Sequence, residues 1–321
     1  MKHAQPTPEA PEPTPQALLE RIEWTVGKRL DGVLQGDYRT LLRGHGIDLA
    51  DLREYQFHDD VRHIDWNVTA RLQTPYVRQY MEDRELCAWF LLDLSPSVDF
   101  GSRVRKRSVS AAFVAALGSA VSRRGNRVGA VLYGQQVETV LPARGGRLHV
   151  LHLLQRMAQR PLAVAAASRG TTRLGELLQR AATTIPRRSS LFVVSDFISE
   201  AGWEQPLARL ALRHDVVAVR LFDPLEMTLP DLGFVLMQDS ETGEQLFVDT
   251  GARGFRERFA QLAEQREAAL RSSLARAGVD TLELSTEGDL GDDLLRFIDA
   301  RRQRSRLVAG ALARPLQRRT A

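Results

Sequence analysis

Short apolar runs alternate with segments of helical spacing from about residue 85 onward. The runs are AWFLLDLS, SSLFVVSDFIS and DVVAVRLFDP. Because they are apolar almost throughout, without in-and-out alternation, we expect both faces of each strand to be covered, as in the centre of a parallel sheet. Segments such as VRKRSVSAAFVAALGSAVSRRG lie between the runs and predict crossover helices. The pattern predicts an α/β fold: a doubly wound, mostly parallel sheet with helices on both faces.

Two further segments predict antiparallel pairing. RVGAVLYG and QVETVLPA are separated by little more than Gly134 and predict a strand pair. LGFVLMQDSETGEQLFVDT alternates on either side of a glycine-containing turn, which predicts an antiparallel hairpin on the edge of the sheet. A long amphipathic helix, the strand VDTLELST and a helix from about Leu290 complete the predicted domain.

The ends of the chain differ in composition from this domain, which we assign to residues 84–300. Residues 1–17 are rich in proline and predict a disordered tail. Residues 18–83 predict a short helix at ALLERIEWTV, an extended edge strand at YVRQYMED and an ordered loop between them, packed on the main domain with Trp66 as an anchor. Residues 301–321 contain arginines and no acid, and predict a solvated basic tail rather than a binding arm.

Acids and imidazoles gather in the loop of that N-terminal segment. They could form a second metal site or an internal network of ion pairs. We expect the network, because Arg53 and Arg62 lie among the acids. The residues concerned are His58, Asp59, Asp60, His63 and Asp65.

Composition limits the class of protein without selecting a partner. The formal net charge is +4, and a positive balance permits nucleic acid, anionic lipid or an acidic protein alike. The longest weakly polar stretch, SVSAAFVAALGSAV, has 14 residues, fewer than the ~18 that a membrane span requires. With a single cysteine, Cys87, and no signal-peptide pattern, we expect a cytoplasmic protein without a membrane span.

Polar side chains follow the predicted strands where each strand ends. In a doubly wound sheet, ligands bind at the carboxyl ends of the strands. Carboxylates and hydroxyls are hard oxygen ligands, which suit Mg²⁺, with Mn²⁺ or Ca²⁺ as substitutes. Serines two positions apart can place both hydroxyls on one ion. The predicted metal ligands are Asp93, Ser95 and Ser97 after the first strand, Thr172 before a helix, and Asp196 after the strand FVVSD.

The DLSPS run, with Thr172 and Asp196, resembles the metal-ion-dependent adhesion site of von Willebrand factor A domains. The segment REYQFHDDVRHIDWNVTAR ahead of the first strand resembles the signature of a bacterial family catalogued as domain of unknown function fifty-eight. That resemblance implies a von Willebrand A-like, Rossmann-type fold, and a partnership with a MoxR-type AAA+ ATPase.

The resemblance also implies a role for each ligand. Ser95 and Ser97 would coordinate the ion directly, Asp93 and Asp196 mostly through water, and Thr172 directly or through water. The sequence departs from the family pattern at Val98, where methionine is common, and at Arg173, where an acid or amide is common. An arginine at that position would either weaken metal binding or pair with an incoming carboxylate.

We therefore expect a non-enzymatic adaptor that uses the metal to bind a carboxylate-bearing protein client and presents it to the ATPase. One alternative is a metal-dependent hydrolase that uses Asp93 and Asp196, although the chain has no GxSxG or GxxxxGK[ST] motif. The other is an arginine-driven binder of nucleic acid or of a membrane surface, for which no recognition motif is present. We expect no nucleic-acid partner.

Overall fold

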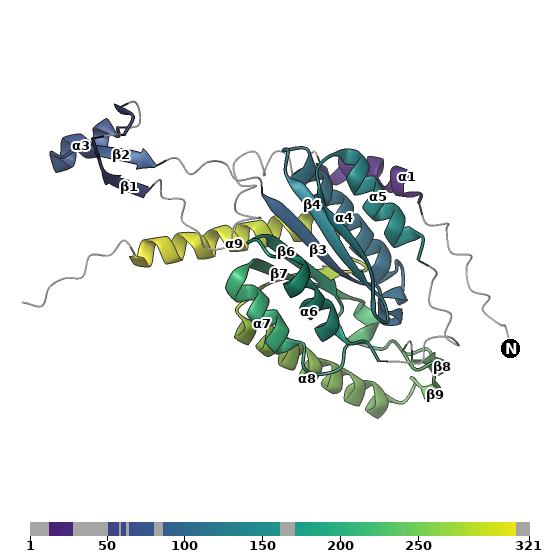
Figure 1. Cartoon of the computed structure of the whole chain (residues 1–321). Coiled ribbons are helices and arrows are strands. Elements are labelled where there is room, and N and C mark those ends of the chain that lie inside the picture. The colour runs from purple at the N-terminus through teal and green to yellow at the C-terminus, as the bar shows by residue number, and fades with distance from the viewer. Residues whose placement is uncertain are drawn as a thin grey trace, which may run out of the picture.

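A computed structural model describes residues 13–27, 51–57, 59–61, 64–79, 86–160, 171–239 and 241–312. Its centre is a six-stranded sheet in the order β10-β7-β6-β3-β4-β5 (Figure 1). All neighbouring strands run parallel except β5, which pairs antiparallel with β4. The strands are β3 (Cys87–Asp93), β4 (Arg127–Tyr133), β5 (Val137–Arg144), β6 (Ser190–Ser195), β7 (Asp215–Phe222) and β10 (Asp280–Ser285).

Helices cover both faces of this sheet, which confirms the predicted mixed α/β class (Figure 1). One face packs against α1, α4, α5 and α9, and the other against α6, α7 and α8. The helices are α1 (Pro15–Ile22), α4 (Lys106–Ser122), α5 (Arg147–Ala158), α6 (Leu174–Thr184), α7 (Glu204–Arg213), α8 (Arg253–Ala277) and α9 (Leu290–Leu312).

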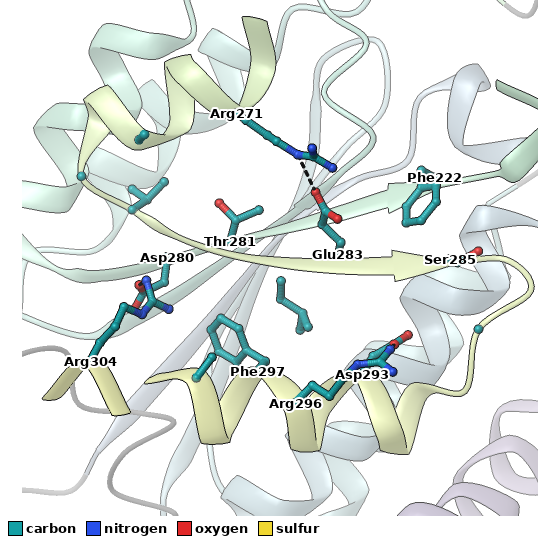
Figure 2. Close-up of a pocket in the computed structure, with 16 residues that line it drawn as sticks. Phe222, Arg271, Asp280, Thr281, Glu283, Ser285, Asp293, Arg296, Phe297 and Arg304 are labelled. Carbon is teal, nitrogen blue, oxygen red and sulfur yellow. Dashed lines mark hydrogen bonds and ion pairs between the residues drawn. The ribbon is translucent and has the colours of Figure 1, made fainter. Parts of the chain in front are cut away.

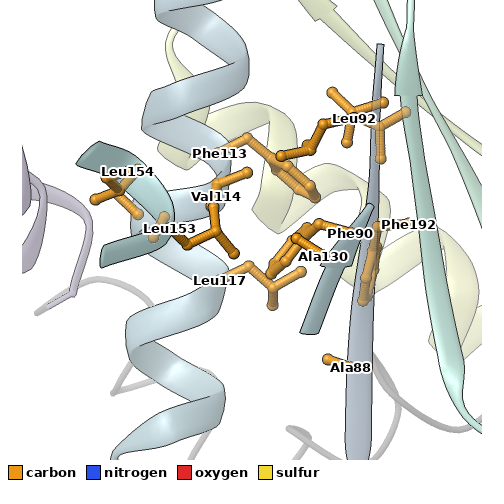
Figure 3. Close-up of a cluster of buried hydrophobic side chains, with 14 of the residues drawn as sticks. Ala88, Phe90, Leu92, Phe113, Val114, Leu117, Ala130, Leu153, Leu154 and Phe192 are labelled. Carbon is orange, nitrogen blue, oxygen red and sulfur yellow. The ribbon is translucent and has the colours of Figure 1, made fainter. Parts of the chain in front are cut away.

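Successive residues of β3 point to opposite faces of the sheet and are buried on both. Phe90 packs against Phe113 of α4 and Phe192 of β6, with ring centroids 6.0 and 5.6 Å away (Figure 3). Trp89 and Leu91 belong to the core on the other face. Burial on both faces explains why the strand is apolar at successive positions from Cys87 to Leu92 rather than at alternate ones.

The strand order changes direction at β3. From β3 the chain moves to β4 and β5 on one side, and it then returns to β6, β7 and β10 on the other. The carboxyl ends of β3 and β6 therefore lie side by side at the point where a doubly wound sheet places its ligands.

The expected hairpin forms, but its predicted place on the edge of the large sheet is wrong. Strands β8 (Phe234–Gln238) and β9 (Gln245–Asp249) pair antiparallel as a separate two-stranded sheet. They hydrogen-bond to each other, while β5 and β10 form the two edges of the large sheet.

The first described residues form α1 and a short π-helix, Glu23–Gly27. Helix α1 begins at Pro15, inside the stretch predicted as a tail, because proline is well suited to the first position of a helix. Thr14 caps this helix by accepting a hydrogen bond from the backbone of Ala17. Leu19 is fully buried in the core beneath α4 and α5. Residues 1–12 of the predicted tail lie outside the described part.

The segment expected to be a loop contains regular structure. Strands β1 (Asp51–Glu54) and β2 (Tyr76–Gln79) pair antiparallel, and α3 (Trp66–Leu72) lies between them in sequence. Figure 1 draws this unit apart from the six-stranded sheet. Trp66 is 70% exposed, so its expected role as a packing anchor is wrong within the described residues. Packing of this unit on the main domain stays a prediction.

Little of the predicted ion-pair network in that unit can be followed. Asp65 uses Oδ1 to accept a hydrogen bond from the backbone of Val68 at the start of α3. Asp59 accepts one from the backbone of Gln56. His58, Arg62 and His63 lie outside the described residues.

Helix α9 continues past residue 300, where the basic tail was expected to begin. Arg301 is 2% exposed and forms ion pairs with Asp215 and Asp280, and Arg304 also pairs with Asp280. The start of the arginine-rich stretch therefore belongs to the folded domain, because its charges have buried or half-buried partners. None of the helices in the part of the chain that the structure describes has the length and apolar composition that a membrane span requires.

Candidate metal centre

The predicted ligands converge at the carboxyl ends of β3 and β6. These strands pair in parallel with Leu92 opposite Val194, so Asp93 and Ser195 follow at the same level. The predicted ligands are all buried: Asp93, Ser95, Ser97, Thr172 and Asp196 have exposed fractions of 0 to 5%. Burial of so many polar side chains at one strand end is unusual unless they serve one another or a ligand.

Asp93 is fixed by its neighbours on both strands. Its Oδ1 accepts a hydrogen bond from the backbone of Ser95 at 2.9 Å, and its Oδ2 accepts one from the Ser195 hydroxyl at 2.6 Å. Burial and the nearby charge of Asp196 raise the pKa of Asp93 to about 6. Because both carboxylate oxygens are already engaged, Asp93 is placed to orient the serines rather than to reach outward.

Ser95 and Ser97 point their hydroxyls toward each other across Pro96. The two Oγ atoms lie 3.1 Å apart. Pro96 begins a short 3₁₀ helix, Pro96–Asp99, which turns the chain out of β3. Neighbouring oxygens around an octahedral Mg²⁺ with bonds of about 2.0–2.1 Å lie roughly 3 Å apart. The two hydroxyls therefore have the separation that two adjacent ligands of one ion require.

Asp196 is held by a buried lysine that sequence reasoning missed. Lys106, at the start of α4, is fully buried and places Nζ 2.6 Å from Asp196 Oδ2 and 2.7 Å from Glu226 Oε1. Burial alone would lower the pKa of Lys106, but the two carboxylates outweigh it and raise that pKa. The only signal in the sequence was that Lys106 is one of three lysines in the chain.

The backbone after Asp196 is strained in a way that aims its carboxylate. Phe197 has φ of 59°, a left-handed conformation that is rare for a large side chain and is concentrated at functional sites. In this turn, the backbone of Ile198 donates to Asp196 Oδ1 at 3.0 Å, and the backbone of Phe197 donates to the Ser195 hydroxyl. Packing of Phe197 against Trp203, with centroids 5.3 Å apart, stabilises the conformation.

Thr172 contacts the carboxylate of Glu241, which, like Lys106, was not predicted as part of the site. The Thr172 hydroxyl donates to Glu241 at 2.9 Å from Oε1 and 3.0 Å from Oε2. Glu241 is only 8% exposed. Burial and the charge of Asp196 raise its pKa. Glu241 lies in the DSETGE turn of the β8–β9 hairpin, and no local pattern showed which way that turn would face.

Arg173 does not enter this cluster. Its guanidinium pairs with Glu176 and Glu200, and its side chain is 62% exposed. The departure from the family pattern at this position therefore leaves the buried cluster unchanged.

The charges of the cluster favour a cation. Asp93, Asp196 and Glu241 are buried carboxylates, and the only buried ammonium among the described residues near them, Lys106, is shared with Glu226. Buried charges of one sign repel each other unless a counter-charge is present. The donor set consists of oxygens alone and fits Mg²⁺ or Mn²⁺ better than a metal that prefers nitrogen or sulfur.

The fit of a metal ion to this cluster depends on the hydroxyl groups of its serines and threonine. Within the described residues, no group of three or more His, Cys, Asp and Glu side chains is arranged to hold a metal. A site here must therefore draw on Ser95, Ser97 and Thr172 and leave the remaining positions to water or an added carboxylate, as Mg²⁺ sites commonly do.

A hollow with a volume of about 910 Å³ lies elsewhere, between α8, α9 and the outer edge of β10 (Figure 2). Its charged groups pair with one another: Arg271 with Glu283, Arg296 with Asp293 and Arg304 with Asp280. Since these charges are already matched, this groove offers no polar group that calls for a ligand. The candidate site remains the cluster at the carboxyl ends of β3 and β6.

Comparison with known proteins supplies the family. The family model described as protein of unknown function DUF58 matches residues 51–269. The chain belongs to this family. An uncharacterized protein of Mycobacterium tuberculosis (strain ATCC 25618 / H37Rv) is 37% identical over 305 residues, which cover 94% of this chain and 92% of the relative. An uncharacterized protein of Mycobacterium avium is 33% identical over 54% of this DUF58 chain and 98% of its own length.

A solved structure is similar at a coarser level. The conserved hypothetical protein BatB from Bacteroides thetaiotaomicron aligns with 68% of this DUF58 protein and 99% of its own chain, at 14% identity and a TM-score of 0.40.

Proposed function

We propose that this DUF58 protein is a non-enzymatic, metal-dependent adaptor of the cytoplasm with a von Willebrand A-like, Rossmann-type domain. It binds a carboxylate-bearing protein client and works with a MoxR-type AAA+ ATPase in the assembly or activation of protein complexes. The observation that carries the proposal is the 3.1 Å separation of the Ser95 and Ser97 hydroxyls, in a buried cluster with Thr172 and two aspartates.

Each residue of the centre has a task in this proposal. Ser95, Ser97 and Thr172 hold the ion, whose positive charge and open coordination position attract a carboxylate. Asp93 orients the loop through its hydrogen bonds to Ser95 and Ser195, and Asp196 reaches the ion through water. A metal that lacks charged ligands in direct contact keeps a strong attraction for an outside carboxylate, which suits binding.

The surface beside the centre favours a protein as the ligand. The β8–β9 hairpin, whose turn carries Glu241, exposes several apolar side chains along its strands. Clustered exposed apolar groups are typical of surfaces that bind proteins. The exposed residues are Phe234 (80%), Leu236 (50%), Leu246 (65%) and Phe247 (77%).

The hydrolase alternative receives little support from the geometry. Both oxygens of Asp93 accept hydrogen bonds, and Asp196 is bound to Lys106. The described histidines do not help, because His149 and His152 lie on α5 and His214 precedes β7, at the opposite end of the sheet. Neither of the two aspartates is therefore free to act as a general base that activates water.

A pull-down tests the proposal. The full chain is immobilised and offered a glutamate-rich peptide as a carboxylate-bearing probe, in Mg²⁺ and in EDTA. We expect the wild type and the exposed-position variant Ser272→Ala to retain the peptide in Mg²⁺ and to lose it in EDTA, and Ser95→Ala to retain little in either buffer. Equal retention of the peptide by wild type in both buffers, or by Ser95→Ala in Mg²⁺, contradicts a metal-dependent adaptor. A purified MoxR-type ATPase is offered in Mg²⁺ in the same way, and no retention of it by wild type contradicts that partnership.

A further inference from the structure

The carboxylate of Glu241 lies inside the candidate metal centre although it comes from a separate sheet. It is 8% exposed and accepts hydrogen bonds from the Thr172 hydroxyl, and the backbone of Ser97 is close enough to favour its ionised form. Thr172 and Ser97 lie on different sides of the cluster, one before α6 and one after β3. Glu241 therefore lies next to both of the segments that are needed to surround one ion.

The turn of the hairpin is built to present this side chain. Asp239 Oδ1 accepts hydrogen bonds from the backbones of Glu241 and Thr242, both at 2.8 Å. The backbones of Asp239 and Glu244 are joined at 2.9 Å, and Gly243 supplies the left-handed residue with φ of 73° that closes the turn. A turn with this many internal hydrogen bonds holds the Glu241 backbone in one position relative to the hairpin.

We propose that Glu241 is the chain's own carboxylate ligand of this metal centre. It takes the position that the proposed function, on which this inference rests, gives to the carboxylate of a client. Its two oxygens contact the Thr172 hydroxyl at 2.9 and 3.0 Å, about the spacing of neighbouring ligands around one Mg²⁺. The chain thus closes its own centre, and a client's carboxylate must replace Glu241.

The hairpin is held in a way that allows such replacement. An isolated two-stranded sheet is marginally stable at best, and β8 and β9 form such a sheet with mostly exposed side chains. Its buried anchors are Val248 and Thr250, at the end away from the turn. Withdrawal of Glu241 therefore breaks few apolar contacts, and a protein that covers the exposed apolar face of the hairpin can move the turn out of the centre.

Manganese tests this ligand through the water that remains on the metal. The full chain is titrated with Mn²⁺, and the affinity and the water-proton relaxation of the bound ion are measured. We expect Glu241→Ala to bind Mn²⁺ roughly tenfold or more weakly and to show higher relaxation, because water replaces the lost carboxylate. Glu241→Gln keeps an oxygen but not the charge, and should give an intermediate affinity.

The control is Glu244→Ala, which removes an exposed carboxylate from the same turn and should match wild type. Hydrogen exchange gives a second readout that does not depend on metal affinity: Mg²⁺ should protect the β8–β9 amides in wild type and not in Glu241→Gln.

The outcomes separate the two proposals. If wild type binds Mn²⁺ and Ser95→Ala does not, while Glu241→Ala and Glu241→Gln keep wild-type affinity, relaxation and exchange, the Glu241 ligand is overturned and the metal centre stands. If wild type shows no saturable Mn²⁺ binding, the proposed function itself is overturned.

Discussion

The ammonium of Lys106 lies 2.6 Å from Asp196 Oδ2, and both side chains are at most 1% exposed. This ion pair joins the first turn of α4 to the end of β6 beneath the candidate metal centre. Removal of one partner from a buried pair leaves the other charge without compensation, which typically costs about 3–5 kcal/mol.

Lys106→Met should therefore lower the free energy of unfolding by about 3–5 kcal/mol, because Asp196 and Glu226 lose their shared ammonium. Urea denaturation followed by circular dichroism measures the change. Arg253→Met, which breaks an exposed pair with Glu257, is the control and should leave stability nearly unchanged. Equal stability of Lys106→Met and wild type would show that the buried pair contributes nothing.

A divalent ion that binds only the folded state should raise the melting temperature. At a concentration of 100 times the dissociation constant, the gain is about 2.7 kcal/mol, or roughly 5 °C or more for a domain of this size. Thermal denaturation with and without Mg²⁺ should show this shift in wild type and in Ser272→Ala, and not in Ser97→Ala. A shift of the same size in Ser97→Ala places the ion elsewhere.

Asp223 should make stability depend on acid pH. The residue is fully buried and accepts hydrogen bonds from the backbones of Ser102 and Leu225 and from the Ser102 and Thr286 hydroxyls. Burial opposes ionisation, but these bonds outweigh it and lower the pKa of Asp223 below 3.8. The stabilisation is therefore complete above that value and is lost as the pH falls through the lower, folded-state pKa.

The matching variant is Asp223→Asn, which cannot ionise. At pH 7 it should be less stable than wild type by about 1.5–3 kcal/mol, the contribution of hydrogen bonds to a charged group. Urea denaturation at a series of pH values should show this difference shrinking below about pH 4. Glu257→Gln, at an exposed position, controls for the general effect of losing an acid, and a difference that stays constant with pH excludes Asp223 as the source.

The aromatic cluster between α4 and the sheet should contribute strongly to the stability of the domain. Phe113 is fully buried, with its ring 6.0 Å from Phe90 and 5.9 Å from Phe192. Phe113→Ala should cost about 3–5 kcal/mol, since it leaves a cavity under a rigid sheet. Phe247→Ala, at a position that is 77% exposed, should have little effect on the same denaturation curve. Similar losses in both variants would contradict this view of the core.

Local patterns in the sequence were sufficient to predict the strands and the residues of the candidate site that follow β3 and β6. Asp93 and Asp196 each follow an apolar run, and parallel strands bring their carboxyl ends to the same edge of a sheet. That geometry brings Ser95 and Ser97 close to Asp196, although about a hundred residues separate them in sequence. Their mutual burial follows from strand order alone.

The other contributors could not be predicted because they depend on packing rather than periodicity. Lys106 reaches Asp196 through a long side chain from a helix whose first residues carry no special pattern. Glu241 depends on the direction of a hairpin that forms its own sheet, whereas alternation shows only that two strands pair. The start of α1 and the continuation of α9 past residue 300 were missed for a related reason. Segments rich in proline or arginine are typical of disordered tails, and only the packing of the folded chain shows that these residues belong to buried helices.

The change of direction at β3 has a consequence for how the protein is made. Ser95 and Ser97 leave the ribosome directly after β3, whereas Thr172, Asp196 and Glu241 leave it only after β4 and β5. Domains generally fold as units during synthesis from the N-terminus. The nascent chain therefore cannot assemble the metal centre that we propose until translation has passed the hairpin.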